Sequence, residues 1–206
     1  MATDLSWETY KEQISQIATL DYNYDEQTYH ASKDKQGWKI DKYHALLGTE
    51  LPGLPLEQGP FARVKEAVLQ YHFPDPDLIS AVFDPSQPLL GRNMYMIAHF
   101  LGMTFNFGVR VTSVVDEVRK NEVGADLRVW GYSYRTLKGH FEVGEIAFLV
   151  TKNLSTGEIF FNIDAYSTPE KISNWFYRTG FRVFGRSLQK YFANSAVRRL
   201  RALITN

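Results

Sequence analysis

The feature that most constrains the fold is a run of about six strand patterns with no room for a helix between them. The patterns lie at residues 78–83, 93–101, 109–115, 126–137, 141–152 and 158–166. Turn signals at Gly139 and over 153–157 separate the last three. Parallel neighbours would need crossovers of a dozen or more residues, so the run predicts an antiparallel meander.

Helical patterns flank this run. Residues 5–20 form a short amphipathic pattern, residues 38–47 alternate weakly as a first strand, and a helix is expected from Pro60 to before Pro74. A helical region begins at Pro169 and is expected to break around 180–185. The last helix should bury residues spaced four apart: Leu188, Phe192, Ala196, Leu200 and Ile204.

An antiparallel sheet with one apolar face must cover that face, and the terminal helix is the longest cover available. We therefore predict an α+β fold in which a curved antiparallel sheet of about six to seven strands wraps the C-terminal helix, the helix-grip arrangement. A hot-dog fold, with its central helix in the palm of the sheet, is the alternative and explains the C-terminal helix less well. Residues 1–206 should form one domain, with 1–22 as a helical extension and 23–206 as the helix-grip unit.

Composition excludes several classes. At 206 residues and 44% hydrophobic, the chain can bury one core. The absence of cysteine excludes disulfides, thiolate metal sites and a cysteine nucleophile. The acidic start shows no signal peptide, and no stretch approaches the ~20 apolar residues of a membrane span, so we expect a cytoplasmic protein.

The net charge of zero conceals an imbalance. From residue 171 onward there are eight basic residues and no acidic one, whereas the first 170 carry 15 basic and 23 acidic. Either the terminal helix docks on an acidic body, or Arg182, Arg186 and Lys190 meet an anionic partner such as a membrane. Nucleic acid is disfavoured, because the same helix needs its apolar face for the core and no base-stacking platform is evident.

The strand at 126–137 places a set of aromatic and hydroxyl side chains on one face. With two hydroxyl residues of the last strand, they are either a filled core or the wall of a cavity for an apolar ligand with a polar head. The candidate ligand-binding residues are Trp130, Tyr132, Tyr134, Thr136, Tyr166 and Ser167.

His140, Glu142 and Glu145 are the candidates for catalysis, because a histidine near carboxylates can exchange protons near neutral pH. In regular strand geometry the two glutamates fall on opposite faces, so a bulge at Gly144 would be needed to bring them together. Alternatively, these residues support a tight hairpin through hydrogen bonds. Phosphate-loop, dinucleotide and metalloprotease motifs are absent, and the five histidines are scattered, so no metal or cofactor is predicted.

One long segment resembles a known family. Gly131-Tyr-Ser-Tyr-Arg-Thr-Leu-Lys-Gly-His-Phe-Glu-Val-Gly-Glu-Ile-Ala-Phe148 is similar to the signature Gly-Phe-x-Tyr-Gly-Thr-Leu-x-Gly-His-x-Glu-x-Gly-Glu-Glu-x-Phe of a bacterial and plant family of domain-of-unknown-function proteins. The resemblance covers nearly the whole chain from about Tyr24, through the shorter matches Tyr24-Asp-Glu26, Leu47-Gly-Thr49, Phe61-Ala-Arg63, Ala165-Tyr-Ser167 and Arg186-x-Leu-Gln189. Arg135, Ile146 and Thr168 depart from the family pattern.

The resemblance supports membership and a helix-grip architecture of the START and Bet v type, but the family has no activity to transfer. Three hypotheses follow. The first is a module that binds a small apolar or amphipathic molecule between sheet and terminal helix. The second is an enzyme (hydrolase, cyclase or isomerase) that uses His140 with Glu142 or Glu145. The third is a protein that contacts anionic membranes.

Overall fold

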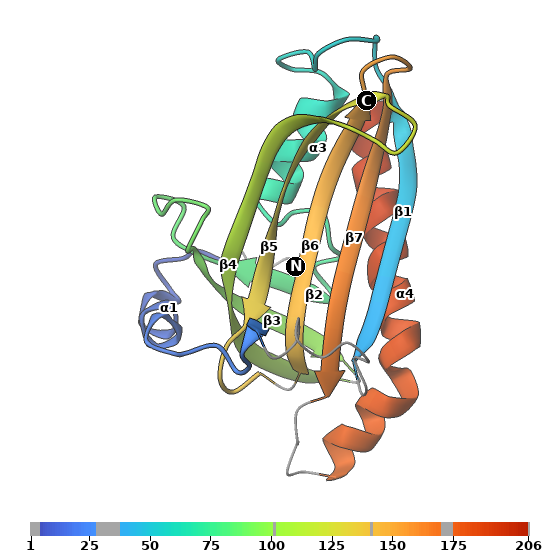
Figure 1. The fold of residues 1–206 in the computed structure, drawn as a ribbon. Coiled ribbons are helices and arrows are strands. Elements are labelled where there is room, and N and C mark those ends of the chain that lie inside the picture. The colour runs from blue at the N-terminus through green and yellow to red at the C-terminus, as the bar shows by residue number, and fades with distance from the viewer. Residues whose placement is uncertain (1–4, 28–37, 101, 141, 170–174, 206) are drawn as a thin grey trace.

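A seven-stranded antiparallel sheet forms the body of the molecule (Figure 1). The computed structural model describes residues 5–27, 38–100, 102–140, 142–169 and 175–205, with side chains described up to Thr168 and again from Gln189. The strand order is β1-β7-β6-β5-β4-β3-β2. The strands are β1 Lys39–Thr49, β2 Ile79–Val82, β3 Asn93–Phe100, β4 Met103–Lys120, β5 Asp126–Thr136, β6 Glu142–Asn153 and β7 Glu158–Pro169.

Two helices cover the concave face of this sheet, α3 (Pro60–Leu69) and α4 (Trp175–Thr205), while α1 (Lys11–Ala18) lies beside β3 and β4 (Figure 1). The helix-grip prediction is thereby confirmed, and the hot-dog alternative is not. The expected break around residues 180–185 is wrong, because α4 runs through it as one helix of 31 residues. Glycine costs a helix about 1 kcal/mol but introduces no clash, so a helix can pass through it.

Strand β4 is much longer than the predicted residues 109–115. Its pairing with β5 shifts register between Val111 and Ser113, which marks a bulge, and the alternation of inward and outward residues changes there. Charged residues dominate beyond the bulge, as at Glu117 and Arg119, so the hydrophobic pattern ends before the strand does. The bulge and the charged residues beyond it explain why the sequence pattern underestimated the C-terminal part of this strand.

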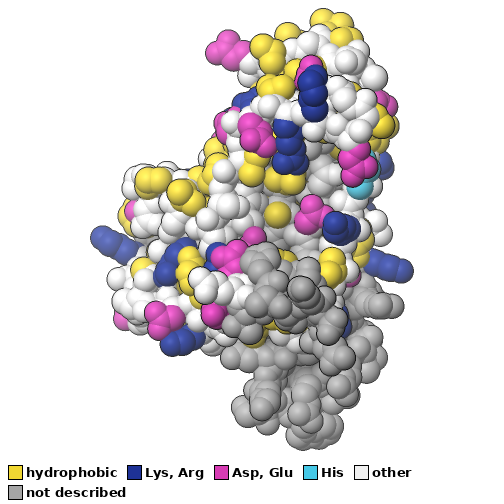
Figure 2. Space-filling view, viewed as in Figure 1, with side chains coloured by type: hydrophobic (Ala, Val, Ile, Leu, Met, Phe, Trp, Pro, Cys, Tyr) yellow, Lys and Arg dark blue, Asp and Glu magenta, His cyan; other side chains and the backbone are white. Residues whose placement is uncertain are grey.

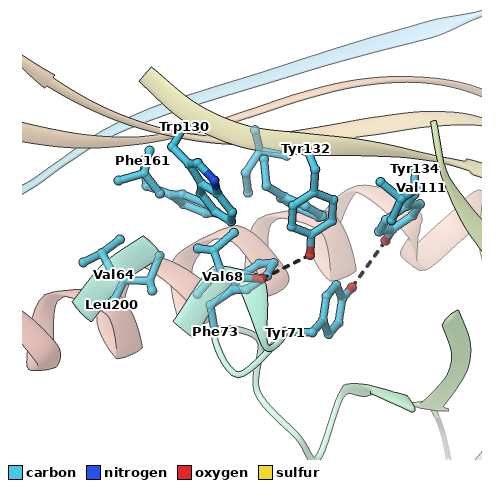
Figure 3. Packing of buried hydrophobic residues seen from close by; sticks show 14 of the residues in the cluster. Val64, Val68, Tyr71, Phe73, Val111, Trp130, Tyr132, Tyr134, Phe161 and Leu200 are labelled. Carbon is cyan, nitrogen blue, oxygen red and sulfur yellow. Dashed lines mark hydrogen bonds between the residues drawn. The ribbon is translucent and has the colours of Figure 1, made fainter. Parts of the chain in front are cut away.

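One half of the concave face is filled by a packed core. The hydroxyl of Tyr132 donates to the carbonyl of Val68 over 3.1 Å, which ties β5 to α3 (Figure 3). Phe73 packs edge-on against Phe148, with ring centroids 4.8 Å apart, and against Phe161 at 5.4 Å. The same cluster contains the buried side chains Val64, Trp130, Val150, Ile159, Ala196 and Leu200.

A buried ion pair anchors the loop before α3. Lys152 is fully buried and pairs with Glu50, whose side chain is 2% exposed. The Lys152 ammonium also donates to the carbonyl of Leu51 over 2.9 Å, and the Glu50 carboxylate accepts the Phe61 N–H over 3.2 Å. Because each charge is satisfied by further hydrogen bonds, the pair can be retained inside the protein.

We predict that Lys152→Met lowers the free energy of unfolding by about 3–5 kcal/mol, because it leaves the Glu50 carboxylate buried without its partner. The matched control is Lys120→Met, which removes an exposed pair with Asp126 and should cost less than about 1 kcal/mol. Urea denaturation of both variants measures the two changes. Similar losses in the two variants would contradict the assignment of Lys152 as an anchor.

Candidate functional site

The other half of the concave face is hollow. A cavity of about 230 Å³ lies between the sheet and α4, at the end where β5 finishes and β6 begins. Most of its described wall is apolar, and the lining residues come from all seven strands and from α4. The apolar lining residues include Leu78, Ile79, Ala98, Phe105, Phe107, Ile146, Ile163, Ala165 and Phe192. The polar lining residues include Asp41, Tyr71, Tyr134, Thr136, His140, Glu142 and Ser167.

Tyr71 forms the boundary between the filled and the hollow halves. Its ring packs edge-on against Phe73 in the core, at a centroid distance of 5.0 Å, and its hydroxyl lies 3.3 Å from that of Tyr134 in the cavity wall (Figure 3). Tyr71 follows α3 with φ of 56°, in the left-handed region that glycine usually occupies. The conformation costs roughly 1–2 kcal/mol, so packing and the paired hydroxyls must hold the residue in place.

Burial shapes the chemistry of this wall. It raises the pKa of Tyr134 to about 12, so the phenol is neutral at physiological pH. It also raises the pKa of the Glu142 carboxyl, an effect that Lys39 opposes and Asp41 reinforces. Among the described residues, none donates a hydrogen bond to the carboxylate of Glu142 or Asp41, and none forms an ion pair with either. Both carboxylates therefore line the cavity without a partner among the described residues.

His140 lies at the same end of the cavity but is 7% exposed. Its Nδ1 accepts the Glu142 N–H over 2.9 Å, which places the ring proton on Nε2, and its ring meets that of Phe107 edge-on at 4.3 Å. Burial lowers the pKa of His140 to about 3. A neutral imidazole of such low basicity is poorly suited to the proton exchange near neutral pH that the catalytic hypothesis assigned to it.

Thr136 fastens the hairpin between β5 and β6 to the N-terminal segment. Its hydroxyl donates to Asn23 Oδ1 over 2.6 Å and accepts the Gly144 N–H over 3.0 Å. The Asn23 amide in turn donates to the carbonyl of Glu142 over 2.9 Å. A Cβ at Gly144 would lie 2.2 Å from the carbonyl oxygen of Tyr166, so only glycine fits. These contacts explain the Thr-x-x-Gly-His-x-Glu-x-Gly spacing in structural terms.

Glu145 and Tyr166 also border the cavity, but strand alternation directs their polar groups to the opposite, convex face. Glu145 accepts from the Nε of Arg135 over 3.0 Å, Arg135 also pairs with Glu26, and the hydroxyl of Tyr166 lies 2.9 Å from that of Tyr24. The pairing of β6 with β7 continues through Gly144 without a shift, so the bulge that could have united the two glutamates is absent from this pairing. The sheet separates Glu145 from His140 and Glu142. Charged side chains of both signs are scattered over this convex face (Figure 2).

The remaining predicted site residues divide between core and cavity. Trp130 and Tyr132 belong to the filled half and are absent from the described cavity wall, whereas Tyr134, Thr136 and Ser167 line it. Lys190 is exposed on α4. The side chains of Arg182 and Arg186 lie outside the described residues.

Sequence reasoning missed several cavity residues. Asp41 and Tyr43 come from β1, far in the sequence from the central motif at residues 131–148. They reach the cavity only because β1 pairs with β7. The alternation of residues along β1 could be seen in the sequence. The sequence did not show that one face of this strand lines the cavity. Tyr71 had a weak signal, since a helix ending without glycine can place another residue in the left-handed region.

Neither a metal site nor a membrane-spanning helix is found among the described residues. No group of three or more histidine, aspartate or glutamate side chains is placed to hold a metal ion in this part of the chain. Within the same residues, no helix combines the length and the apolar character that crossing a membrane requires.

We predict that the His140 ring stays neutral down to about pH 4.5, as followed by the NMR shifts of its ring protons, because burial depresses its pKa to about 3. Since the unfolded ring binds its proton near pH 6.5, His140 makes stability fall as pH drops from about 6.5 toward 3, by up to about 1.4 kcal/mol per pH unit. His140→Asn should remove this dependence. Glu142 titrates in both proteins, so its opposite contribution cancels from the difference. Protonation of the His140 ring near pH 6.5 would refute the prediction.

Comparisons with known proteins identify the fold and the family. A point mutant of norcoclaurine synthase from Thalictrum flavum, solved with a transition-state analogue, matches with a TM-score of 0.51 and 6% identity, over 82% of this chain and 94% of that one. The major latex-like protein 151 of Panax ginseng matches with a TM-score of 0.50 and 10% identity, over 81% and 97%. At such identities the likeness shows the fold alone. No curated protein matches the sequence. The profile of the family described as Domain of unknown function (DUF1990) matches residues 23–199, well over half of the chain, which therefore belongs to this family.

Proposed function

We propose that this protein is a binding module for a small amphipathic molecule, held between the concave face of the sheet and α4. The observation that carries the proposal is the cavity of about 230 Å³, whose described wall is mainly apolar with a few polar groups at one end. Such a distribution is typical of small-molecule sites, in which apolar walls supply affinity and placed polar groups supply orientation. Its volume exceeds the roughly 150 Å³ of an engineered apolar cavity that binds benzene.

Apolar burial supplies the driving force in this proposal. Phe105, Phe107 and Phe192 would contact the body of the ligand, since each contributes to the wall. Removing apolar surface from water is worth roughly 25 cal/mol per Å², so a single-ring or short-chain molecule gains several kcal/mol before the costs of association. Glu142, Tyr134 and Ser167 would contact its polar end.

The enzyme hypothesis has less support. It required His140 to act with Glu142 or Glu145, but Glu145 is paired with Arg135 across the sheet and His140 is a weak base. Of these three residues, Glu142 keeps a carboxylate that faces the cavity and forms no ion pair among the described residues. The membrane hypothesis depends on Arg182, Arg186 and Lys190 and stays a prediction of the sequence.

We predict that Ala165→Phe weakens the binding of N-phenylnaphthylamine, an uncharged dye, by at least about tenfold, because the new ring occupies cavity volume beside Ile146 and Ile163. The matched control is Asp164→Phe, which adds the same ring one residue away on the opposite, exposed face and should change the affinity by less than about twofold. Dye fluorescence measures the affinity, and circular dichroism verifies the fold.

A second blocking variant guards against misfolding. Ala98→Phe fills the cavity from β3, on the far wall, and should weaken dye binding in the same way. Absence of dye binding to the unmodified protein, or equal affinity in both blocking variants and the control, would refute the proposed function.

A further inference from the structure

Two acidic side chains flank a patch of small residues in the cavity. Asp41 on β1 lies opposite Ala165 of β7, and Glu142 on β6 lies opposite Pro169 of the same strand. Between them Gly144 pairs with Ser167. Because both carboxylates project from the concave face and the residues between them are small, the wall leaves room for a head group that contacts both.

The described wall supplies no positive charge to balance these carboxylates. Neither lysine nor arginine is among the described lining residues. Lys39, on the same face opposite Ser167, influences Glu142 electrostatically but is exposed and forms no ion pair with it among the described residues. Among the other titratable lining residues, Tyr134 and His140 are neutral at physiological pH, because burial holds their pKa values near 12 and 3.

A buried carboxylate without a partner costs free energy, which a bound cation would recover. An ammonium group donates up to three hydrogen bonds, and such charge-assisted bonds are roughly twice as strong as neutral ones. A hydroxyl would donate only one hydrogen bond and would bring no positive charge to the carboxylates, and an anionic head would be repelled by both side chains.

Resting on the proposed function, we infer that the amphipathic ligand carries a protonated amine, held by Glu142 and Asp41, with its apolar body against the phenylalanines of the opposite wall. The site selects a cationic amphiphile in preference to an alcohol or a fatty acid of the same length.

The experiment compares hexylamine, hexanol and hexanoate as competitors of bound N-phenylnaphthylamine at pH 7, in the unmodified protein and in Glu142→Gln. We expect hexylamine to bind at least about tenfold more tightly than hexanol, and hexanoate to bind most weakly. Glu142→Gln should reduce the affinity for hexylamine by about tenfold and leave that for hexanol within about twofold. Asp41→Asn should give a smaller loss of the same kind.

The outcomes separate this inference from the proposed function. If hexanol or hexanoate binds as tightly as hexylamine, the inference is wrong while the binding module stands. If none of the three displaces the dye and the dye itself does not bind, both are wrong. An unchanged dye affinity of Glu142→Gln, with a thermal unfolding temperature no lower than that of the unmodified protein, verifies that the variant has lost a charge and not its fold.

Discussion

The site depends on a mismatch between the concave face of the sheet and the helices that cover it. Helix α3 and the C-terminal part of α4 fill one half of that face with Val64, Val68 and Leu200. Toward the start of β6 the helical cover is α4, whose Gln189 and Phe192 reach the cavity. Tyr71 closes the filled half at this boundary. The space persists because the strained turn at Tyr71 ends α3 before it can extend along the sheet.

The alternation of a strand divides the central motif between two faces. Thr136, Glu142 and Gly144 belong to the concave side, whereas Arg135 and Glu145 belong to the convex side. On the convex side, Arg135 joins Glu145 to Glu26 and so fastens the N-terminal segment to the sheet. Arg135 was one of the departures from the family signature, and here it has a structural role. One contiguous motif thus serves both anchoring and cavity formation.

The buried carboxylates of Glu50 and Glu142 have different roles, because they differ in their hydrogen-bond and ion-pair partners. The carboxylate of Glu50 accepts from Lys152 and from the Phe61 N–H, so it is satisfied within the protein and stabilises a loop. Glu142 also experiences desolvation, as the rise of its pKa indicates, but no described side chain neutralises it. A satisfied buried charge is a structural element, whereas an unsatisfied one facing a cavity is suited to a ligand.

The sequence by itself determined the order of elements, the antiparallel pairing and the covering role of the terminal helix, because strand alternation and helical spacing are local periodicities. It also indicated that Glu142 and Glu145 point to opposite faces. Tertiary structure decided which half of the aromatic face is filled: Tyr132 bonds to α3, whereas Tyr134, two residues on, lines the cavity. It also brought Asp41 to the side of Glu142, through the pairing of β1 with β7. Local sequence patterns do not predict such long-range pairing, because the free energy that selects it comes from packing between segments far apart in the chain.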